Sequence, residues 1–294
     1  MVFVIFLVLT VVFFLTRLTG DPVHFFVPMD TSRANLEEIR ERYGFNDPLW
    51  QQYLRFMGDA VRGDFGDSLR QRDSATGLVL ARIPATLQLG AAALAVSLLI
   101  GVPLGIFSAL NRGSLGDKAA TLISVLGLSV PAFLMGLLLI LFFSVYLGWL
   151  PTSGRGSLAQ LIMPTATLAA FSVARYARLS RSTMLDVLGQ DYIRTGRAKG
   201  LSESKVVWVH ALKNASIPLL TITGLQAGHL LGGAVVVEQI FAWPGMGRLL
   251  LQSLLNRDFP VVMATIVFVA LVYTLFSLLT DLAYAWANPE VRLK

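Results

Sequence analysis

Long apolar runs alternate with short polar segments along the whole chain. Residues 1–16 carry no charge. Five further uncharged runs cover residues 83–111, 119–154, 156–174, 214–237 and 259–280. At a rise of about 1.5 Å per residue, each of these five can cross a hydrocarbon core about 30 Å thick. The first run is shorter, so we expect it to use Met1 and residues beyond Arg17, or the natural start to lie upstream. The pattern predicts an all-α integral membrane protein with six transmembrane helices.

The second of these five runs is long and contains Pro131, after Gly127-Leu-Ser-Val. A proline inside a helix removes one backbone hydrogen bond and bends or breaks the helix. Peptide groups that lose their partner at membrane depth are tolerated only against protein or water. We therefore predict one long bent helix that ends near Tyr146, with Trp149 at the membrane interface.

Residues 19–82 form the longest polar segment and predict a small helical insertion after the first span. One helix is expected to end at Gly44. The next has Asp47 as its cap and Pro48 at the first helical position. Its apolar side is expected to comprise Trp50, Leu54, Met57 and Val61, and the Gly- and Asp-rich run 63–68 ends it as a turn.

Charge then predicts the orientation. The segment 175–213 holds eight Lys and Arg residues against three acidic residues. Cytoplasmic loops of membrane proteins carry an excess of positive charge. We therefore expect this segment and both termini in the cytoplasm, and residues 19–82 on the other side. Small residues at Gly101 and Gly105 have the spacing that lets two membrane helices approach closely.

Residues 182–213 form the most cationic stretch between two spans and predict a helical hairpin. Residues 186–199 have helical composition, and Gly200 stands where a left-handed residue ends a helix. Ser202 can cap the second helix, with Leu201 and Val206 as a hydrophobic staple. The second helix carries Val206, Val207, Trp208 and Val209, so we expect a partner protein to cover this apolar surface.

Composition excludes several classes of function. The chain is 55% hydrophobic and 14% charged, and it has no cysteine and three scattered histidines. We therefore expect no disulfide and no metal site. The net charge of +6 lies in loops between apolar runs, which leaves no basic domain for nucleic acid. The sequence contains no phosphate-binding Gly-x-x-x-x-Gly-Lys-Ser/Thr motif, so any ATP is expected on another chain.

Polar residues inside the apolar runs are candidates for a transport pathway, because they are costly in hydrocarbon. Gln226 and His229 lie one helical turn apart in the run 214–237, and Glu238 follows at its outer end. The alternative is that His229 only bonds a neighbouring helix. We predict no catalytic residue.

Three motifs resemble permease subunits of ABC importers in the dipeptide, oligopeptide and nickel branch. The run Asp191-Tyr-Ile-Arg-Thr-Gly-Arg-Ala-Lys-Gly-Leu201, followed by His210-Ala-Leu-Lys-Asn-Ala215, is similar to the loop that docks on the ATPase. The acidic first residue and the final proline of the general pattern are missing here. Asp47-Pro-Leu-x-x-Gln-Tyr53 with Gly63-Asp-Phe-Gly-x-Ser68 resembles the extracytoplasmic insertion, and Glu238 to Arg248 resembles the family's run after the fifth helix.

The resemblance implies the fold and the assembly. The chain would be one type I permease domain, residues 1–294, in a bacterial inner membrane. Its partners would be a homologous second (C-type) permease, two ATPases that bind ATP and Mg, and an extracytoplasmic solute-binding protein. The chain itself would bind no cofactor and would form half of an alternating-access pathway for peptides, nickel or a related solute.

The resemblance also assigns residues. Coupling to the ATPases would fall to Tyr192, Arg194, Thr195, Arg197, Ala198, Lys199, Gly200, Leu201, Ser202, Lys205 and Val206. The outer gate and the contact with the binding protein would involve Phe241, Trp243, Pro244 and Gly245.

The alternatives to an importer subunit are a proton-coupled transporter and a membrane-embedded enzyme. A proton-coupled transporter needs no ATPase, but it usually has acidic residues at mid-span, and none lies there in this sequence. A membrane-embedded enzyme needs a nucleophile–base pair or a metal cluster, and the histidines lie far apart without such a motif. The identity of the solute is not encoded in any of these motifs.

Overall fold

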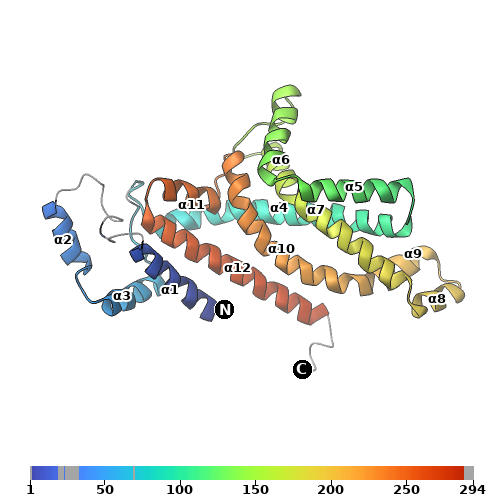
Figure 1. Cartoon of the computed structure of the whole chain (residues 1–294), viewed down its shortest axis with the longest axis horizontal. Coiled ribbons are helices and arrows are strands. Elements are labelled where there is room, and N and C mark those ends of the chain that lie inside the picture. The colour runs from blue at the N-terminus through green and yellow to red at the C-terminus, as the bar shows by residue number, and fades with distance from the viewer. Residues whose placement is uncertain (1, 19–22, 24–32, 69, 288–294) are drawn as a thin grey trace. The chain divides into compact units, whose positions relative to one another are not determined.

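We describe a computed structural model of the chain that covers residues 2–18, 23, 33–68 and 70–287. This part of the chain is helical, and its one β-type pairing is a bridge between Asp67 and Ser74. The elements in order are α1 (Val2–Leu18), α2 (Arg33–Tyr43), α3 (Leu49–Val61), α4 (Ala75–Leu110), α5 (Leu115–Ser129), α6 (Ala132–Leu139), η2 (Ile140–Tyr146), α7 (Leu158–Leu188), α8 (Asp191–Ala198), α9 (Glu203–Lys205), η3 (Val206–Ala211), α10 (Leu212–Ile240), α11 (Met246–Leu255) and α12 (Phe259–Ala287). The all-α prediction is confirmed (Figure 1).

Three described helices are long and apolar enough to cross a membrane: α4, α7 and α12. A fourth span results if α5 and the helix that follows it are counted as one broken span. The apolar stretch of α1 is shorter, over Phe3–Leu15. The count of six spans therefore stays a prediction.

The chain divides into two compact units. Unit 1 comprises Met1–Thr86 and Pro244–Thr274, and unit 2 comprises Leu87–Trp243 and Leu275–Lys294. Whether residues 1–294 act as one domain, as predicted, is not tested by this division into units.

In unit 1, α1, α3, α4, α11 and α12 contribute to one apolar cluster, which contains Leu9, Val79, Leu249 and Val261. Polar bonds join α1 to α3: the hydroxyls of Thr10 and Tyr53 lie 2.8 Å apart, and the Arg17 guanidinium donates to the Gln52 amide oxygen at 2.9 Å. These bonds give the polar end of α1 partners inside the protein.

The insertion differs from the prediction in three details. Pro48 is the N-cap of α3, and the Asp47 carboxylate instead accepts a hydrogen bond from Arg55 at 2.7 Å. Of the expected apolar side only Met57 packs on the cluster of unit 1, while Trp50, Leu54 and Val61 are exposed. The helix α4 begins at Ala75, inside the segment predicted as insertion. Residues 19–22 and 24–32 lie outside the described part.

The side of α3 that meets α1 is chosen by aromatic packing. The Phe13 ring of α1 meets Tyr53 edge-on at 5.1 Å between centroids and lies 5.6 Å from Phe56. These positions fall beside the expected apolar stripe, so periodicity within α3 pointed to the wrong face. Gly63 and Gly66 both have left-handed backbone, which confirms the predicted turn after α3.

In unit 2, α7 packs on α5, α6 and α10. The helix α4 also lies against α7, because Gly101 and Gly105 bring their backbone onto Val173 to Arg181. A Cβ atom at Gly105 would overlap the carbonyl oxygen of Ala177 and approach the Ser180 Cβ within 2.5 Å. The predicted close approach at these glycines is confirmed.

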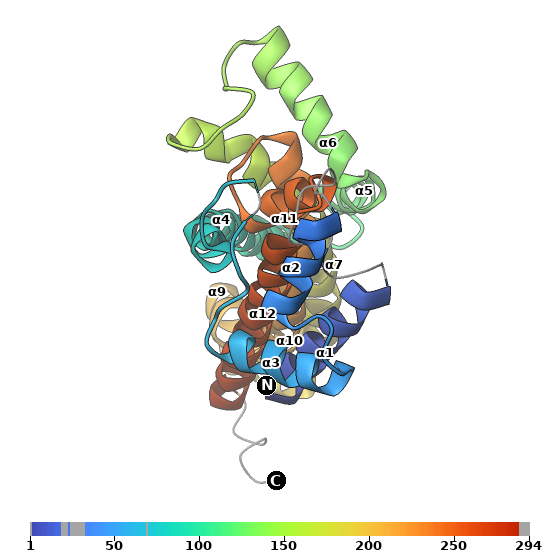
Figure 2. The same cartoon turned by 90° about the vertical axis from the view of Figure 1, so that its left-hand side faces the viewer.

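The run 119–154 is broken rather than bent. The helix α5 ends at Ser129, α6 begins at Ala132, and the two helices meet at 106°. Figure 1 shows α6 leaving the line of α5, and in the perpendicular view of Figure 2 α5 is seen almost end-on. The helical segment ends at Tyr146, as predicted.

The contact at Gly105 generates the first prediction. We expect Gly105→Ala to destabilise the protein by about 1–3 kcal/mol, because the added methyl overlaps backbone that cannot yield without moving α7. Gly90→Ala on the same helix is the control, since the space around Gly90 is open. Thermal unfolding in detergent measures both. Equal midpoints for the two variants would contradict the close contact.

Candidate functional site

The predicted hairpin is built around a left-handed glycine. The helix α8 ends at Ala198, and Gly200 has φ of 79°. The Gly200 N–H donates to the Arg197 carbonyl at 2.9 Å, and the Leu201 N–H donates to the Gly196 carbonyl at 3.3 Å. These two bonds form a Schellman motif, which satisfies the free carbonyls of the helix end. The predicted left-handed turn at Gly200 is confirmed. Its role in coupling stays a prediction.

The second arm begins at the predicted cap and runs without a break into a long helix. The Ser202 hydroxyl accepts a hydrogen bond from the Lys205 N–H at 3.4 Å. From Glu203 the chain continues through α9 and η3 into α10, which ends at Ile240. The segment η3 is a π-helix, a rare form that often marks functional sites. The hairpin is thus a direct extension of α10.

The first arm is less continuous than expected. We predicted one helix over 186–199, but α7 ends at Leu188 with Gly189 as its C-cap, and α8 starts at Asp191. The glycine ends the helix because it has no side chain to favour its continuation. The first arm is therefore separated from α7 by a break at Gly189, whereas the second arm is continuous with α10.

A salt bridge spans the turn of the hairpin. The Arg197 guanidinium donates to both oxygens of Glu203, at 2.6 and 3.2 Å. These hydrogen bonds hold the pKa of Glu203 below its usual range and raise the pKa of Arg197. Since the folded-state pKa of Glu203 is lowered, the pair contributes above the usual carboxyl pKa and is lost as pH falls through the lowered value.

Most predicted coupling residues face outward. Nine of them are exposed: Tyr192, Arg194, Thr195, Arg197, Ala198, Lys199, Gly200, Ser202 and Lys205. Leu201 is half-buried, and Val206 is only 1% exposed. Val206 therefore cannot touch a partner in this conformation, and its placement among the coupling residues is corrected to an anchoring position.

The valines of the second arm are covered by the chain itself. Val206 and Val207 lie in a buried cluster with Ile106 of α4 and Met184 of α7, which Leu201 also joins. The expectation that a partner covers these two valines is therefore wrong. Trp208 and Val209 point the other way and are 54% and 52% exposed. The apolar surface left for a partner is theirs, with Tyr192 of α8.

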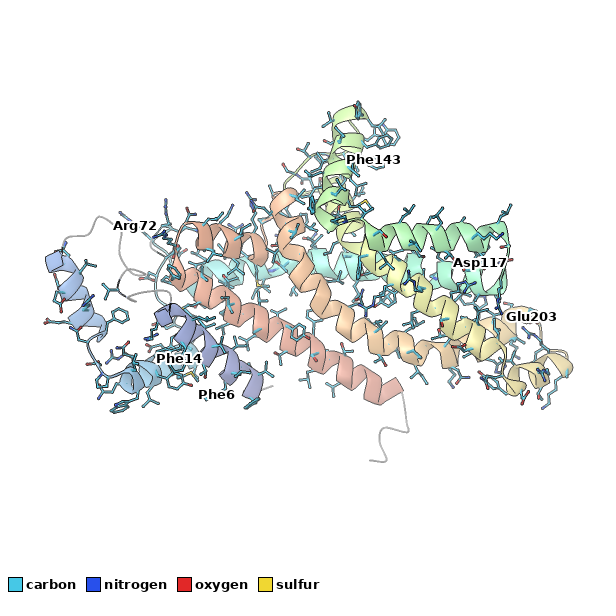
Figure 3. The ribbon with its side chains drawn as sticks, in the orientation of Figure 1. Phe6, Phe14, Arg72, Asp117, Phe143 and Glu203 are labelled. Atoms are coloured by element: carbon cyan, nitrogen blue, oxygen red, sulfur yellow. The ribbon has the colours of Figure 1, made fainter. Side chains whose placement is uncertain are left out.

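Sequence reasoning missed a second polar cluster, which joins α5 to α7. The Arg181 guanidinium of α7 donates to both oxygens of Asp117, at 2.7 and 2.9 Å. The Asp117 carboxylate also accepts from Ser108 and from the Gly113 N–H. Figure 3 shows Asp117 and Glu203 at the same end of unit 2. The one available signal was an acid next to an apolar run, three residues after Ser114, which caps α5.

One pathway candidate, Gln226, lies on a polar seam between α7 and α10. The Gln226 amide donates to the Ser172 hydroxyl at 2.8 Å, and its oxygen accepts from Arg175 at 3.0 Å. Gln226 and Glu238 are both fully buried, and the His229 side chain lies outside the described part. Gln226 thus has its partners inside the chain. The pathway role of these three residues stays a prediction.

The outer-gate candidates are internal rather than exposed. Phe241 and Trp243 are each 1% exposed, Gly245 is buried and Pro244 is half-buried. The Phe241 carbonyl accepts from the Gly154 N–H at 2.9 Å, and the Arg155 guanidinium lies 5.8 Å from the Trp243 ring. In this conformation the Phe241 carbonyl and the Trp243 ring contact the loop at 150–157, and the two aromatic side chains offer almost no surface to a binding protein.

The chain is similar to a family of transport proteins and to two permeases of that kind. Residues 101–293 match the family described as binding-protein-dependent transport system inner membrane component. The glutathione transport system permease protein GsiC of Escherichia coli K12 is 42% identical over 99% of this chain and 95% of its own length. The oligopeptide transport system permease protein AppB of Bacillus subtilis is 42% identical over 92% of this chain and 90% of its own.

A solved structure shares the fold. A chain of the MetNI methionine ABC transporter, in an inward-facing conformation, superposes with a TM-score of 0.61. The match covers 72% of this chain and 96% of the other, at 20% sequence identity.

The Asp117 cluster generates the second prediction. We expect Asp117→Asn to destabilise the protein by about 1–3 kcal/mol, because Arg181 loses its counterion and a charge-assisted bidentate pair. Asp186→Asn, at an exposed acid on α7, is the control and should leave stability unchanged. Thermal unfolding in detergent measures both variants. If the two midpoints agree, the pair does not hold α5 to α7.

Proposed function

This chain belongs to the family of binding-protein-dependent transport system inner membrane components, and from that premise we propose that it forms half of the translocation pathway for short peptides. It is a membrane permease of an ABC importer and a multi-pass inner membrane protein. The observation that carries the peptide assignment is the 42% identity, over nearly the whole chain, to permeases named for glutathione and for oligopeptides. Glutathione is itself a short peptide.

The proposed assembly holds this chain, a homologous second permease of the C type, two ATPases and an extracytoplasmic binding protein. ATP and Mg would be bound by the ATPases, and both termini of this chain would lie in the cytoplasm. The excess of Lys and Arg in 175–213 supports that orientation. The fold shared with the MetNI chain supports the permease architecture.

The hairpin supports a mechanism of coupling. Its exposed face would dock into a groove of an ATPase, as helices commonly bind in grooves. Because the second arm continues into α10, a displacement of the hairpin reaches α10 along one helix. The cluster of Val206 and Val207 with Ile106 and Met184 passes the same displacement to α4 and α7. Closure of the ATPase pair would thereby rock these helices and alternate the access of the pathway.

The test of function is a reconstitution. The chain is purified from detergent-solubilised membranes with its partners, placed in liposomes and supplied with ATP and the loaded binding protein. We expect co-purified ATPases and ATP-dependent uptake of short peptides. A chain that purifies alone and transports on a proton gradient without ATP would overturn the importer mechanism. Uptake of Ni²⁺ without uptake of peptides would overturn the peptide assignment and favour the nickel alternative.

The turn of the hairpin generates a separate prediction. We expect Gly200→Val to lower transport per ATP hydrolysed while expression stays largely intact. The space around Gly200 is open, so the cost is the left-handed backbone, about 1–2 kcal/mol for a residue with a side chain. Gly58→Val is the control, because Gly58 lies in α3, outside the hairpin, in open space and without a left-handed backbone. Transport equal to the wild type in the Gly200 variant would show that the turn geometry does not matter for coupling.

A further inference from the structure

The break between α5 and α6 opens beside a cavity that none of the assigned roles uses. The cavity has a volume of about 520 Å³ and lies between the break, α7 and α10, all in unit 2. Sites for small molecules usually have volumes of about 300–1,000 Å³ and mostly apolar walls. The wall here includes Met135, Phe171 and Leu230, so its size and character fit a small solute.

The break supplies backbone groups without partners. The Val130 N–H bonds the Leu126 carbonyl, and the Met135 N–H bonds the Pro131 carbonyl. No donor among the described residues reaches the carbonyl oxygens of residues 127–129, because Pro131 has no N–H and the chain turns away there. Peptide groups in this state are stable at membrane depth only beside protein or a water-filled cavity.

Ser172 adds a directed side chain to the same cavity. It is 2% exposed and lines the wall, and its oxygen accepts a hydrogen bond from the Gln226 amide at 2.8 Å. The Gln226 oxygen is in turn fixed by Arg175. Among the described residues no acceptor binds the Ser172 hydroxyl hydrogen, so this hydrogen is left to donate to a further acceptor.

None of the described lining residues is charged, and none carries an imidazole or a thiol. A bare divalent cation would find neither carboxylates nor nitrogen ligands here. The available groups are backbone carbonyls, the hydroxyls of Ser129, Thr167 and Ser172, and apolar side chains. The hydroxyls of Ser129 and Thr167 already donate to the carbonyls of Val125 and Met163, which leaves the Ser172 hydroxyl as the free donor among the described residues. A peptide backbone matches this set, since its N–H groups pair with carbonyls and its carbonyl accepts from a hydroxyl.

We propose that this break cavity is a solute-contact site of the pathway, in which a short peptide pairs its backbone with the carbonyls of residues 127–129 and with Ser172. The proposal rests on the proposed function. No charged group of the described residues lines the cavity, so it selects a peptide by its backbone hydrogen bonds and its size and not by the charge of its side chains. Gln226 is then a positioning residue that orients Ser172 and does not itself touch the solute.

The first test fills the cavity. Ala132 is an exposed residue of its lining, and Ala119 of α5 is exposed but lies outside it. We expect Ala132→Phe in the reconstituted complex to lower uptake of Ala-Trp-Ala by about tenfold or more and to affect trialanine much less. The ATPase activity stimulated by the loaded binding protein should persist, which shows that the complex is assembled. Ala119→Phe should transport both peptides like the wild type.

The outcomes separate the two proposals. A wild-type complex that takes up neither peptide defeats the proposed function. A wild-type complex that takes up both, with an Ala132→Phe variant that is unchanged or equally impaired for both, overturns the break cavity as a solute site.

The second test uses the absence of cysteine from this chain. In Ala132→Cys, the introduced thiolate attacks the tripeptide Ala-Cys-Ala carried as its thiopyridyl disulfide, forms a mixed disulfide and releases thiopyridone. We expect an ATP-dependent adduct on this chain that excess trialanine suppresses. Ala119→Cys is the control and should give no such adduct. Equal labelling at both positions, or labelling that trialanine leaves unchanged, would overturn the proposal.

Discussion

Hydrocarbon offers no hydrogen-bond partner to a peptide group, and most features of this protein follow from that constraint. Most of each described apolar run is helical, since a helix satisfies its backbone internally. Where Pro131 removes a partner, α5 and α6 separate by 106° and a cavity lies beside the freed carbonyls. The prolines at 164 and 218 remain inside α7 and α10, where helix continues on both sides.

The second theme is that close backbone contact and short polar bonds hold α7 in place. Gly105 lets α4 lie directly on α7, and the Asp117–Arg181 pair fixes the start of α5 to the same helix. At the hairpin, Val206 and Val207 add an apolar anchor that reaches α4 and α7. A displacement of the hairpin is thus transmitted to the packed helices of unit 2.

Several parts of the site could be read from the sequence because they depend on neighbours in the chain. At the end of α8 the Gly200 N–H donates to the carbonyl three residues earlier, and the Leu201 N–H donates to the carbonyl five residues earlier. Ser202 caps the next helix by accepting from the N–H three residues on. The glycine spacing at 101 and 105 likewise predicted a close helix contact, although not the helix that makes it. Local geometry carries this information, so periodicity and residue type were sufficient.

The sequence by itself determined the all-α membrane class, the hairpin with its left-handed turn and the position of the helix break, since each follows from residues within a few positions of one another. Only the tertiary structure decided which side of α3 meets α1, that Val206 is an anchor while Trp208 stays exposed, and that Asp117 pairs with Arg181. These outcomes depend on side chains brought together from distant helices. Periodicity shows that a face is apolar, but packing alone decides what covers it.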